Sequence, residues 1–313
     1  METAPFVRFK EKILENCGRV IIGKEEAAEQ LAVCLIAGGH ILLEDVPGTG
    51  KTMLLRAFAR SIGGEFRRIQ FTPDLMPSDL TGISFYNQKK GEFEFRPGPL
   101  FAQVILADEI NRATPRSQSA LLEVMEEKQI TVDGVTYPMM EPYLVMASQN
   151  PIESYGTFPL PEAQLDRFFM RLRLGYMTRE QEIRVLRRPD SRRLAEELRP
   201  VTEEGEVAAL REAFPQVRVS DDIAGYMMDL TEATRRSDLL QCGVSTRGTL
   251  ALYRACQISA AMQGRDYVIP EDVKREALYV LPHRLTLVSQ SHLDSVRFLE
   301  NLLDEIPVPL EKL

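Results

Sequence analysis

The sequence predicts an α/β domain, with a parallel sheet flanked by helices, followed by a smaller all-helical domain. Residues 104–107 and 144–148 are short apolar runs without polar alternation, which is typical of strands buried on both faces of a parallel sheet. Segments with helical spacing separate these runs. The strand signal ends near Gly175, and helical spacing dominates from Thr178 onward. We therefore expect an α/β core over residues 1–176 and a helical domain over 177–313.

Composition sets outer bounds on function. A chain of 313 residues is long enough for two domains. Its 38 basic and 46 acidic residues give a net charge of −8, which argues against a dedicated nucleic-acid binder. The longest apolar tract, residues 31–43, is interrupted by glycines and is too short to span a bilayer, and residues 1–10 show no secretory signal. The cysteines form no C-x-x-C pair, so we expect reduced core thiols in a cytoplasmic protein: Cys17, Cys34, Cys242 and Cys256.

The first third of the chain alternates helix and strand signals. Residues 5–17 and 25–37 have helical spacing, and strands are expected at residues 40–43 and 67–71. Between the two helices, residues 20–22 are apolar and could either wall an adenine ring or belong to the core.

A glycine loop follows the first strand. Gly48 and Gly50 permit inward-facing backbone N–H groups, Lys51 adds a mobile cation, and Thr52 adds a hydroxyl within reach of Mg²⁺. The helix after the loop directs its positive end at the same place. This pattern indicates a Walker A phosphate-binding loop, although Asp45 replaces its usual first glycine and a simple glycine-rich turn is the alternative. The candidate nucleotide-binding residues are Asp45, Val46, Pro47, Gly48, Thr49, Gly50, Lys51, Thr52 and Met53.

Polar side chains follow two further predicted strands. Asp108 and Glu109 end the strand at 104–107, where Asp108 can hold Mg²⁺ and Glu109 can polarise an attacking water. Alone the pair could be a helix cap, but with the glycine loop it indicates a Walker B motif. Asn150 ends the next strand and could orient that water, or it is only a turn residue before proline.

Two β-hairpins are expected to interrupt the core. Residues 82–101 contain two short alternating runs around a Lys-Gly turn, and residues 129–143 contain an Asp-Gly turn. Phe85, Tyr86, Phe93 and Phe95 on the first hairpin have no evident role in phosphate chemistry. They either contact another protein or pack the hairpin onto its own domain.

The C-terminal part carries one unusual charge. Helices are expected at residues 179–186, 202–213, 221–235, 246–262 and 270–281, with a charged linker at 187–193. Arg247 lies in the first turn of a helix that Ser245 caps, where a cation opposes the helix dipole. This cost suggests a use for Arg247, although a solvated side chain is the alternative.

These motifs in this order resemble the AAA+ ATPases, and within them the MoxR family. The most specific matching segments are residues 44–52, 70–82, 95–101, 108–113 and 147–151. The resemblance implies a P-loop core with a helical lid, ATP and Mg²⁺ as cofactors, and hairpin 82–101 as the family's insertion in helix 2. It implies that Asn150 is sensor 1, Arg167 the arginine finger and Arg247 sensor 2. Arg112, Arg116 and Arg171 remain alternatives for the finger.

The resemblance also implies a biological role. MoxR proteins are ATP-driven rings, commonly hexamers, that remodel or activate a protein partner, often one with a von Willebrand factor A domain or a metal centre. A DNA-dependent motor of the helicase-related clade is the alternative, and a scaffold that binds ATP without turnover is a third. The acidic net charge disfavours the motor, and intact Asp108 and Glu109 disfavour the scaffold. The sequence does not identify the client.

Overall fold

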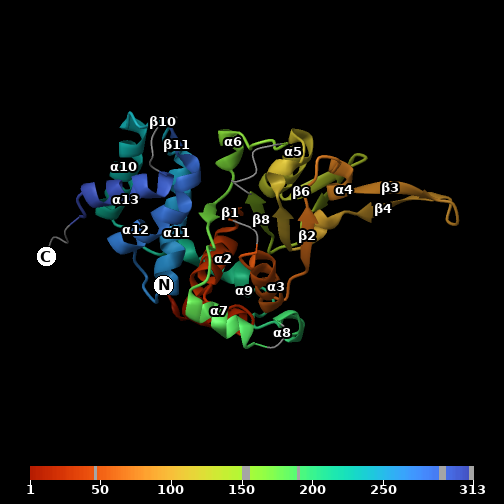
Figure 1. Ribbon diagram of the computed structural model, residues 1–313, viewed down its shortest axis with the longest axis horizontal. Coiled ribbons are helices and arrows are strands. Elements are labelled where there is room, and N and C mark those ends of the chain that lie inside the picture. Colours follow the sequence, from red (N-terminus) through yellow and green to blue (C-terminus); the bar gives the residue numbers. More distant parts are fainter. Residues whose placement is uncertain (46–47, 150–155, 189–190, 289–293, 310–313) are drawn as a thin grey trace.

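A five-stranded parallel sheet forms the centre of the molecule (Figure 1). The computed structural model describes residues 1–45, 48–149, 156–188, 191–288 and 294–309. The strands lie in the order β2-β5-β8-β1-β9 and pair in parallel, so their carboxyl ends share one edge. Their bounds are β1 Ile41–Glu44, β2 Phe66–Gln70, β5 Val104–Asp108, β8 Leu144–Gln149 and β9 Met170–Leu172.

The central strands β5 and β8 are buried on both faces, as the sequence predicts. Leu42 and Ile105 belong to one apolar cluster, whereas their neighbours Leu43 and Leu106 belong to the other. Alternate residues of a strand point to opposite faces, so each cluster covers one side of the sheet. Helices α1–α3 pack on one side and α5 on the other. The core helices are α1 Ala4–Gly18, α2 Glu25–Ala37, α3 Lys51–Ser61, α4 Pro77–Thr81, α5 Pro115–Glu127 and α6 Glu162–Leu165.

One core helix starts later than expected. The apolar spacing of residues 111–128 predicts a helix over that range, but the helix begins at Pro115, after a short 3-10 turn, η2 Ile110–Arg112. Proline fixes φ and lacks an N–H, so it fits the first helical position better than the interior.

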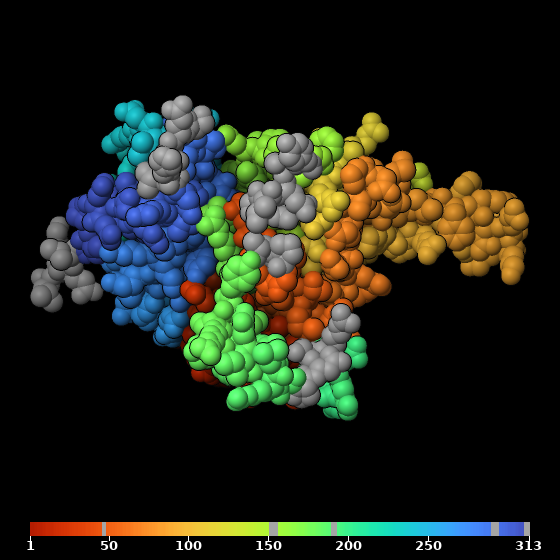
Figure 2. Space-filling model, viewed as in Figure 1, coloured from red at the N-terminus to blue at the C-terminus, as the bar shows by residue number. Residues whose placement is uncertain are grey.

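Both predicted hairpins are present. The first comprises β3 Gly82–Asn87 and β4 Glu92–Pro97, and it projects from the body of the molecule (Figure 2). The second comprises β6 Gln129–Val132 and β7 Val135–Pro138. Its turn has positive φ at both Asp133 (51°) and Gly134 (80°), the conformation that Asp-Gly favours in a two-residue hairpin turn.

The C-terminal part is mainly helical and joins the core closely. Its helices are α7 Arg179–Leu186, α8 Ser191–Glu197, α9 Glu206–Ala213, α10 Asp221–Arg236, α11 Thr246–Met262, α12 Pro270–Val280 and α13 Ser295–Glu305. Helix α8 packs on α3 and α9 packs on α2, so the first helices after residue 177 lie against the core. The division at 176/177 remains a prediction. A short antiparallel ribbon, β10 Leu240–Cys242 with β11 Thr286–Leu287, was not predicted.

One prediction about the cysteines is wrong. Cys17, Cys34 and Cys256 are buried and free, but Cys242 is exposed. It lies in β10, a strand of a two-stranded ribbon at the surface, rather than in the core. Within the described residues, no helix combines the length and apolarity needed to cross a membrane.

Candidate functional site

The glycine loop leads directly into helix α3. Gly50 (φ 90°) precedes Lys51, the first residue of the helix, and Gly48 also has a positive φ of 88°. A Cβ at either glycine would meet no atom within 4 Å, so the backbone conformation rather than crowding favours glycine there. The positive end of α3 therefore faces the loop, as a phosphate site requires. The candidates Val46 and Pro47 lie outside the described residues.

Asp45, which replaces the usual first glycine, has a structural contact. Its Oδ2 accepts the backbone N–H of Leu174 at 3.1 Å. The nearly buried Lys24 donates to the carbonyls of Leu174 at 2.5 Å and Gly175 at 2.9 Å. The segment that leaves β9 for the helical part is thus fixed at the entrance of the phosphate loop.

Lys51 and Asp108, predicted from separate motifs, meet at the carboxyl edge of the sheet. Lys51 Nζ lies 2.7 Å from Asp108 Oδ1, and this carboxylate is almost fully buried. Ser148 Oγ donates to the same oxygen at 2.5 Å, and Arg68 Nη2 donates to Oδ2 at 2.6 Å. Burial raises the pKa of Asp108, but the hydrogen bonds from Lys51, Ser148 and Arg68 outweigh it and hold the pKa below its usual value. Asp108 is therefore ionised and attracts positive charge.

Glu109 is held by two donors. Its Oε2 accepts hydrogen bonds from Gln70 Nε2 at 2.6 Å and from Arg112 Nη1 at 3.0 Å. Its backbone N–H donates to Ser148 Oγ at 2.9 Å, and its φ of 57° is unusual for a residue other than glycine. The carboxylate predicted to activate water is thus present at the loop's edge of the sheet and is restrained there.

The oxygen donors at this edge suit a magnesium ion. Magnesium is usually held by one or two protein oxygens together with substrate phosphates. The Asp108 carboxylate already binds a cationic group at 2.7 Å, and Thr52 follows Lys51 in the first turn of α3. Among the described residues, no group of three or more His, Cys, Asp or Glu could hold a metal by itself. Residues Thr52 and Asp108 therefore fit an ion that arrives with a nucleotide.

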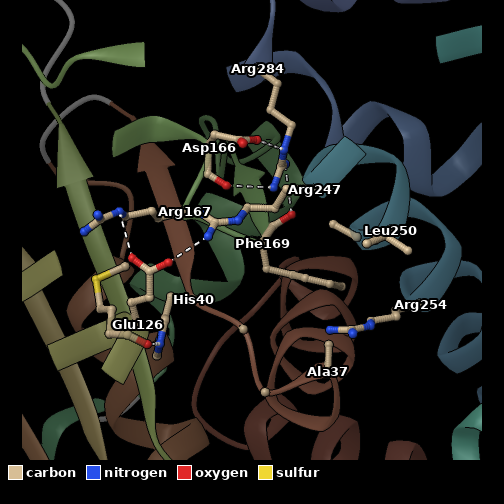
Figure 3. Close-up of a pocket in the computed structure, with 14 residues that line it drawn as sticks. Ala37, His40, Glu126, Asp166, Arg167, Phe169, Arg247, Leu250, Arg254 and Arg284 are labelled. Atoms are coloured by element: carbon tan, nitrogen blue, oxygen red, sulfur yellow. Dashed lines mark hydrogen bonds and ion pairs between the residues drawn. The ribbon is translucent and has the colours of Figure 1, made fainter. Parts of the chain in front are cut away.

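Arg167 and Arg247 lie together at the opposite edge of the sheet. Arg167 lies just before β9. Phe169, the residue before β9, donates its N–H to the carbonyl of His40, the residue before β1, so this segment lies at the amino ends of both strands. Arg247 lies in the first turn of α11, and the Ser245 Oγ accepts the Gly248 N–H as predicted. Both arginines line a cavity of about 490 Å³ at the amino ends of β1 and β9 (Figure 3). The loop and the two arginines thus sit at opposite ends of the same strands.

The other arginine candidates differ in exposure. Arg171 is 7% exposed and binds Glu44 at 2.9 Å. Arg112 binds Glu109 at 3.0 Å, within its own phosphate site. Arg116 is exposed on α5. Asn150 lies outside the described residues, so its predicted role remains a prediction.

Sequence reasoning missed the restraints on the two acids. Arg68 and Gln70 belong to β2, which pairs with β5 so that Gln70 lies beside Asp108. The sequence could have indicated these contacts. Residues 67–71 were predicted to form a strand, and the carboxyl ends of adjacent parallel strands meet at one edge of a sheet. For the apolar segment at residues 20–22, the sequence allowed either an adenine contact or a place in the core. Val20 and Ile22 are both buried. An adenine contact there remains a prediction.

The glycine loop, the paired acids and the parallel sheet define a P-loop nucleotide-binding protein. Residues 40–170 match the ATPase family associated with various cellular activities (AAA), and residues 232–306 match the AAA lid domain. These matches support the predicted combination of an α/β core and a helical lid.

Similar proteins narrow the family. The chain is 46% identical to YeaC of Bacillus subtilis, covering 96% of this chain and 95% of that protein. It is 40% identical to the chaperone MoxR1 of Mycobacterium tuberculosis, covering 91% and 78% respectively. A crystal structure of a protein from Cytophaga hutchinsonii matches with a TM-score of 0.90 at 37% identity, covering 98% of both chains. The chain belongs to the MoxR family of AAA+ ATPases.

Proposed function

We propose that this chain hydrolyses ATP with Mg²⁺ in a ring of identical subunits and uses the cycle to remodel or activate a protein partner. The observation that carries the proposal is the convergence of Lys51, Asp108 and Glu109 at the edge of the sheet where the glycine loop ends. Phosphoryl transfer needs positioning and charge neutralisation more than covalent chemistry, and these groups supply both.

Each residue of the site has a separate proposed role. The several charges of a triphosphate offer Lys51 a stronger partner than Asp108. Thr52 and Asp108 would hold Mg²⁺, which would neutralise phosphate charge. Glu109, once released from Gln70 and Arg112, accepts a proton from the attacking water.

The position of the arginines supports assembly into a ring. The four residues of β1 separate the loop from the arginines by roughly 13 Å of strand. An arginine at the far edge is therefore better placed to contact a nucleotide held by a neighbouring subunit than the nucleotide held by its own subunit. We propose that Arg167, with Arg247 beside it, faces the neighbour's γ-phosphate. A contact that joins two different edges is head-to-tail, and such a contact generates a ring when the rotation between subunits closes. We propose a closed ring, for which six subunits are the family's common number.

The client is proposed from the family and from the projecting hairpin. A relative at 40% identity is named a chaperone, and Tyr86 and Phe93 at the hairpin end are 54% and 74% exposed. We propose a protein client in the cytoplasm, one with a von Willebrand factor A domain or a metal centre. The net charge of −8 disfavours nucleic acid as the client.

Two substitutions test the ATPase proposal. Lys51→Ala removes the side-chain cation of the loop, so calorimetry should show loss of ATP binding. Glu109→Gln keeps the shape but cannot accept a proton, so ATP should bind while turnover falls by about 100-fold or more. Lys89→Ala, an exposed lysine in the turn of the first hairpin, is the control and should leave both unchanged. Micromolar binding by Lys51→Ala, or parental turnover by Glu109→Gln or without Mg²⁺, would refute the proposal.

A further inference from the structure

The carboxylate of Glu126 joins the two arginines. Arg167 Nε lies 3.1 Å from Glu126 Oε2, and Arg247 Nη2 lies 2.7 Å from Glu126 Oε1 (Figure 3). Arg167 comes from the segment between α6 and β9, Arg247 from α11, and Glu126 from the end of α5. One side chain thus links three elements that are distant in sequence.

Two of these charges are placed against local electrostatics. Glu126 lies in the last turn of α5, where the helix dipole disfavours an anion, and Arg247 lies in the first turn of α11, where it disfavours a cation. Their pairing offsets both costs. Exposed ion pairs contribute little to stability, and these side chains are about a third to a half exposed, so stability alone does not account for the arrangement.

The backbones that carry the arginines are fixed separately by Asp166. Its Oδ2 accepts a hydrogen bond from Ser245 Oγ, the cap of α11, at 2.9 Å. Its Oδ1 accepts one from the buried Arg284 Nε at 2.8 Å. Asp166 is also the residue before Arg167, so the start of α11 and the start of the Arg167 side chain have a fixed spacing. The contacts of Asp166 do not fix the direction of the two guanidinium groups. Their direction is set by the ion pairs with Glu126.

We infer that Glu126 is a positioning residue for the transferred phosphate, which holds the guanidinium groups of Arg167 and Arg247 as one pair on the face offered to the neighbouring subunit. This inference rests on the proposed trans role of Arg167. Each arginine uses one nitrogen on Glu126, which leaves the rest of its guanidinium to bind a phosphate. Without the shared carboxylate the two like charges repel each other and must be realigned during the reaction. A misplacement of about 1 Å can cost two orders of magnitude in rate.

The test compares turnover and ATP affinity in rings of matched variants. Glu126→Gln removes the negative charge and replaces one acceptor oxygen with an NH₂ donor, which faces one of the two arginines, so kcat should fall about tenfold or more. The ATP dissociation constant should stay within about twofold of the parent, because the nucleotide is bound by a different edge of the sheet. Glu126→Asp keeps two acceptors on a shorter side chain and should recover part of the loss. Glu127→Gln removes the same charge from the next, exposed residue and should leave kcat unchanged.

Mixing identifies the subunit on which Glu126 acts. Glu109→Gln subunits keep Glu126 and both arginines, so adding them to Glu126→Gln subunits should raise turnover at the intact Glu109 sites. A kcat for Glu126→Gln equal to or above the parent, an equal loss in Glu127→Gln, or no gain on mixing would overturn the inference. If Glu126→Gln fails to form rings, Glu126→Asp in intact rings decides by the same criteria. Parental activity of Arg167→Ala would instead overturn the trans role itself.

Discussion

The Glu109 carboxylate has two donors on one oxygen, and this restraint bears on the rate of turnover. Gln70 Nε2 donates at 2.6 Å and Arg112 Nη1 at 3.0 Å, both to Oε2. A hydrogen bond to a charged group contributes about 1.5–3 kcal/mol. A carboxylate that must first leave these donors reacts with water more slowly than a free one.

Gln70→Ala should therefore raise basal ATP turnover several-fold, up to about tenfold, with unchanged ATP affinity. Arg67→Ala, on the same strand but paired with Glu65, is the control and should have no such effect. Steady-state phosphate release measures the change. Slower turnover in Gln70→Ala would show that Gln70 orients Glu109 productively rather than restraining it.

His40, at the amino end of β1, predicts an acid-dependent loss of stability. Its Nδ1 accepts the Val145 N–H at 3.1 Å, and its Nε2 lies 3.0 Å from the carbonyl of Met125. Its pKa is lowered from 6.5 to about 4, and burial is the largest cause. The Met125 hydrogen bond and Glu141 raise the pKa, whereas nearby Lys128 and Arg211 lower it, and the value of about 4 includes all of these effects. Because the folded pKa is the lower one, this stability is complete above pH 6.5 and is lost as the pH falls towards 4.

Between pH 7.5 and 5.0 the contribution of His40 should fall by about 2 kcal/mol. Urea unfolding at both pH values measures this loss, and His40→Gln, which does not titrate, should lose about 2 kcal/mol less than the parent. Subtracting the variant removes other groups from the comparison, including His283, whose pKa burial also lowers. Equal losses in parent and variant would contradict the assignment.

Among elements, the aromatic residues of the first hairpin differ in their surroundings: one packs against the core and others are exposed, while client contact remains a prediction. Phe95 stacks on Tyr137 of the second hairpin at 4.4 Å and meets Phe101 edge-on at 5.5 Å, so it packs the hairpin onto its own domain. Tyr86 and Phe93 pair with each other at 5.4 Å near the turn and are largely exposed. The exposed pair is the part available to a client.

Tyr86→Ser with Phe93→Ser should keep the parental melting temperature and ATPase but lose capture of the client. Phe95→Ala should instead lower stability by about 1–2 kcal/mol, because it empties a half-buried aromatic contact. Thermal unfolding and affinity capture with a non-hydrolysable ATP analogue measure the two effects. Retained capture by the double variant would place the client elsewhere.

The predicted bounds of a helix were correct where the helix is long and has a capping residue. Helix α11 was predicted with its observed bounds, since Ser245 marks its start and seventeen residues give several turns of pattern. The start of helix α8 was missed, because residues 191–193 were predicted to belong to the charged linker 187–193. Helix α13 carried a readable signal that was missed: Asp294 caps it, and Phe298, Leu299 and Leu303 form its buried face.

For the whole molecule, the position of the helical part decides which residues share a site. Lys51, Asp108 and Glu109 could be placed together from sequence, because they follow parallel strands of one sheet. The meeting of Arg247 with Arg167 could not, since it depends on packing of α11 beside α2 and on the contacts of Asp166 with Ser245 and Arg284. Such long-range contacts leave no periodic pattern in the chain.

With the proposed trans role of Arg167, ATP hydrolysis is expected to be a property of two subunits. An arginine supplied in trans contributes on the order of 10³-fold or more to phosphoryl transfer, so specific activity should rise with protein concentration as rings form. Arg167→Ala and Glu109→Gln should each bind ATP and each be inactive alone. In an equal mixture, a site is competent when an Arg167→Ala subunit receives its arginine from a Glu109→Gln neighbour, which applies to about a quarter of the sites in random rings.

Turnover of the mixture should therefore recover towards about a quarter of the parental value. Phosphate release measures the recovery, and sedimentation with one variant fluorescently labelled confirms that the rings are mixed. The control is the double variant carrying both substitutions, mixed with either single variant. A mixture of the double variant with Glu109→Gln contains no intact Glu109, and a mixture with Arg167→Ala contains no intact Arg167. Both control mixtures should therefore stay inactive. An arginine that acted within its own subunit would leave every site of the first mixture inactive as well, because each subunit there lacks one of the two groups.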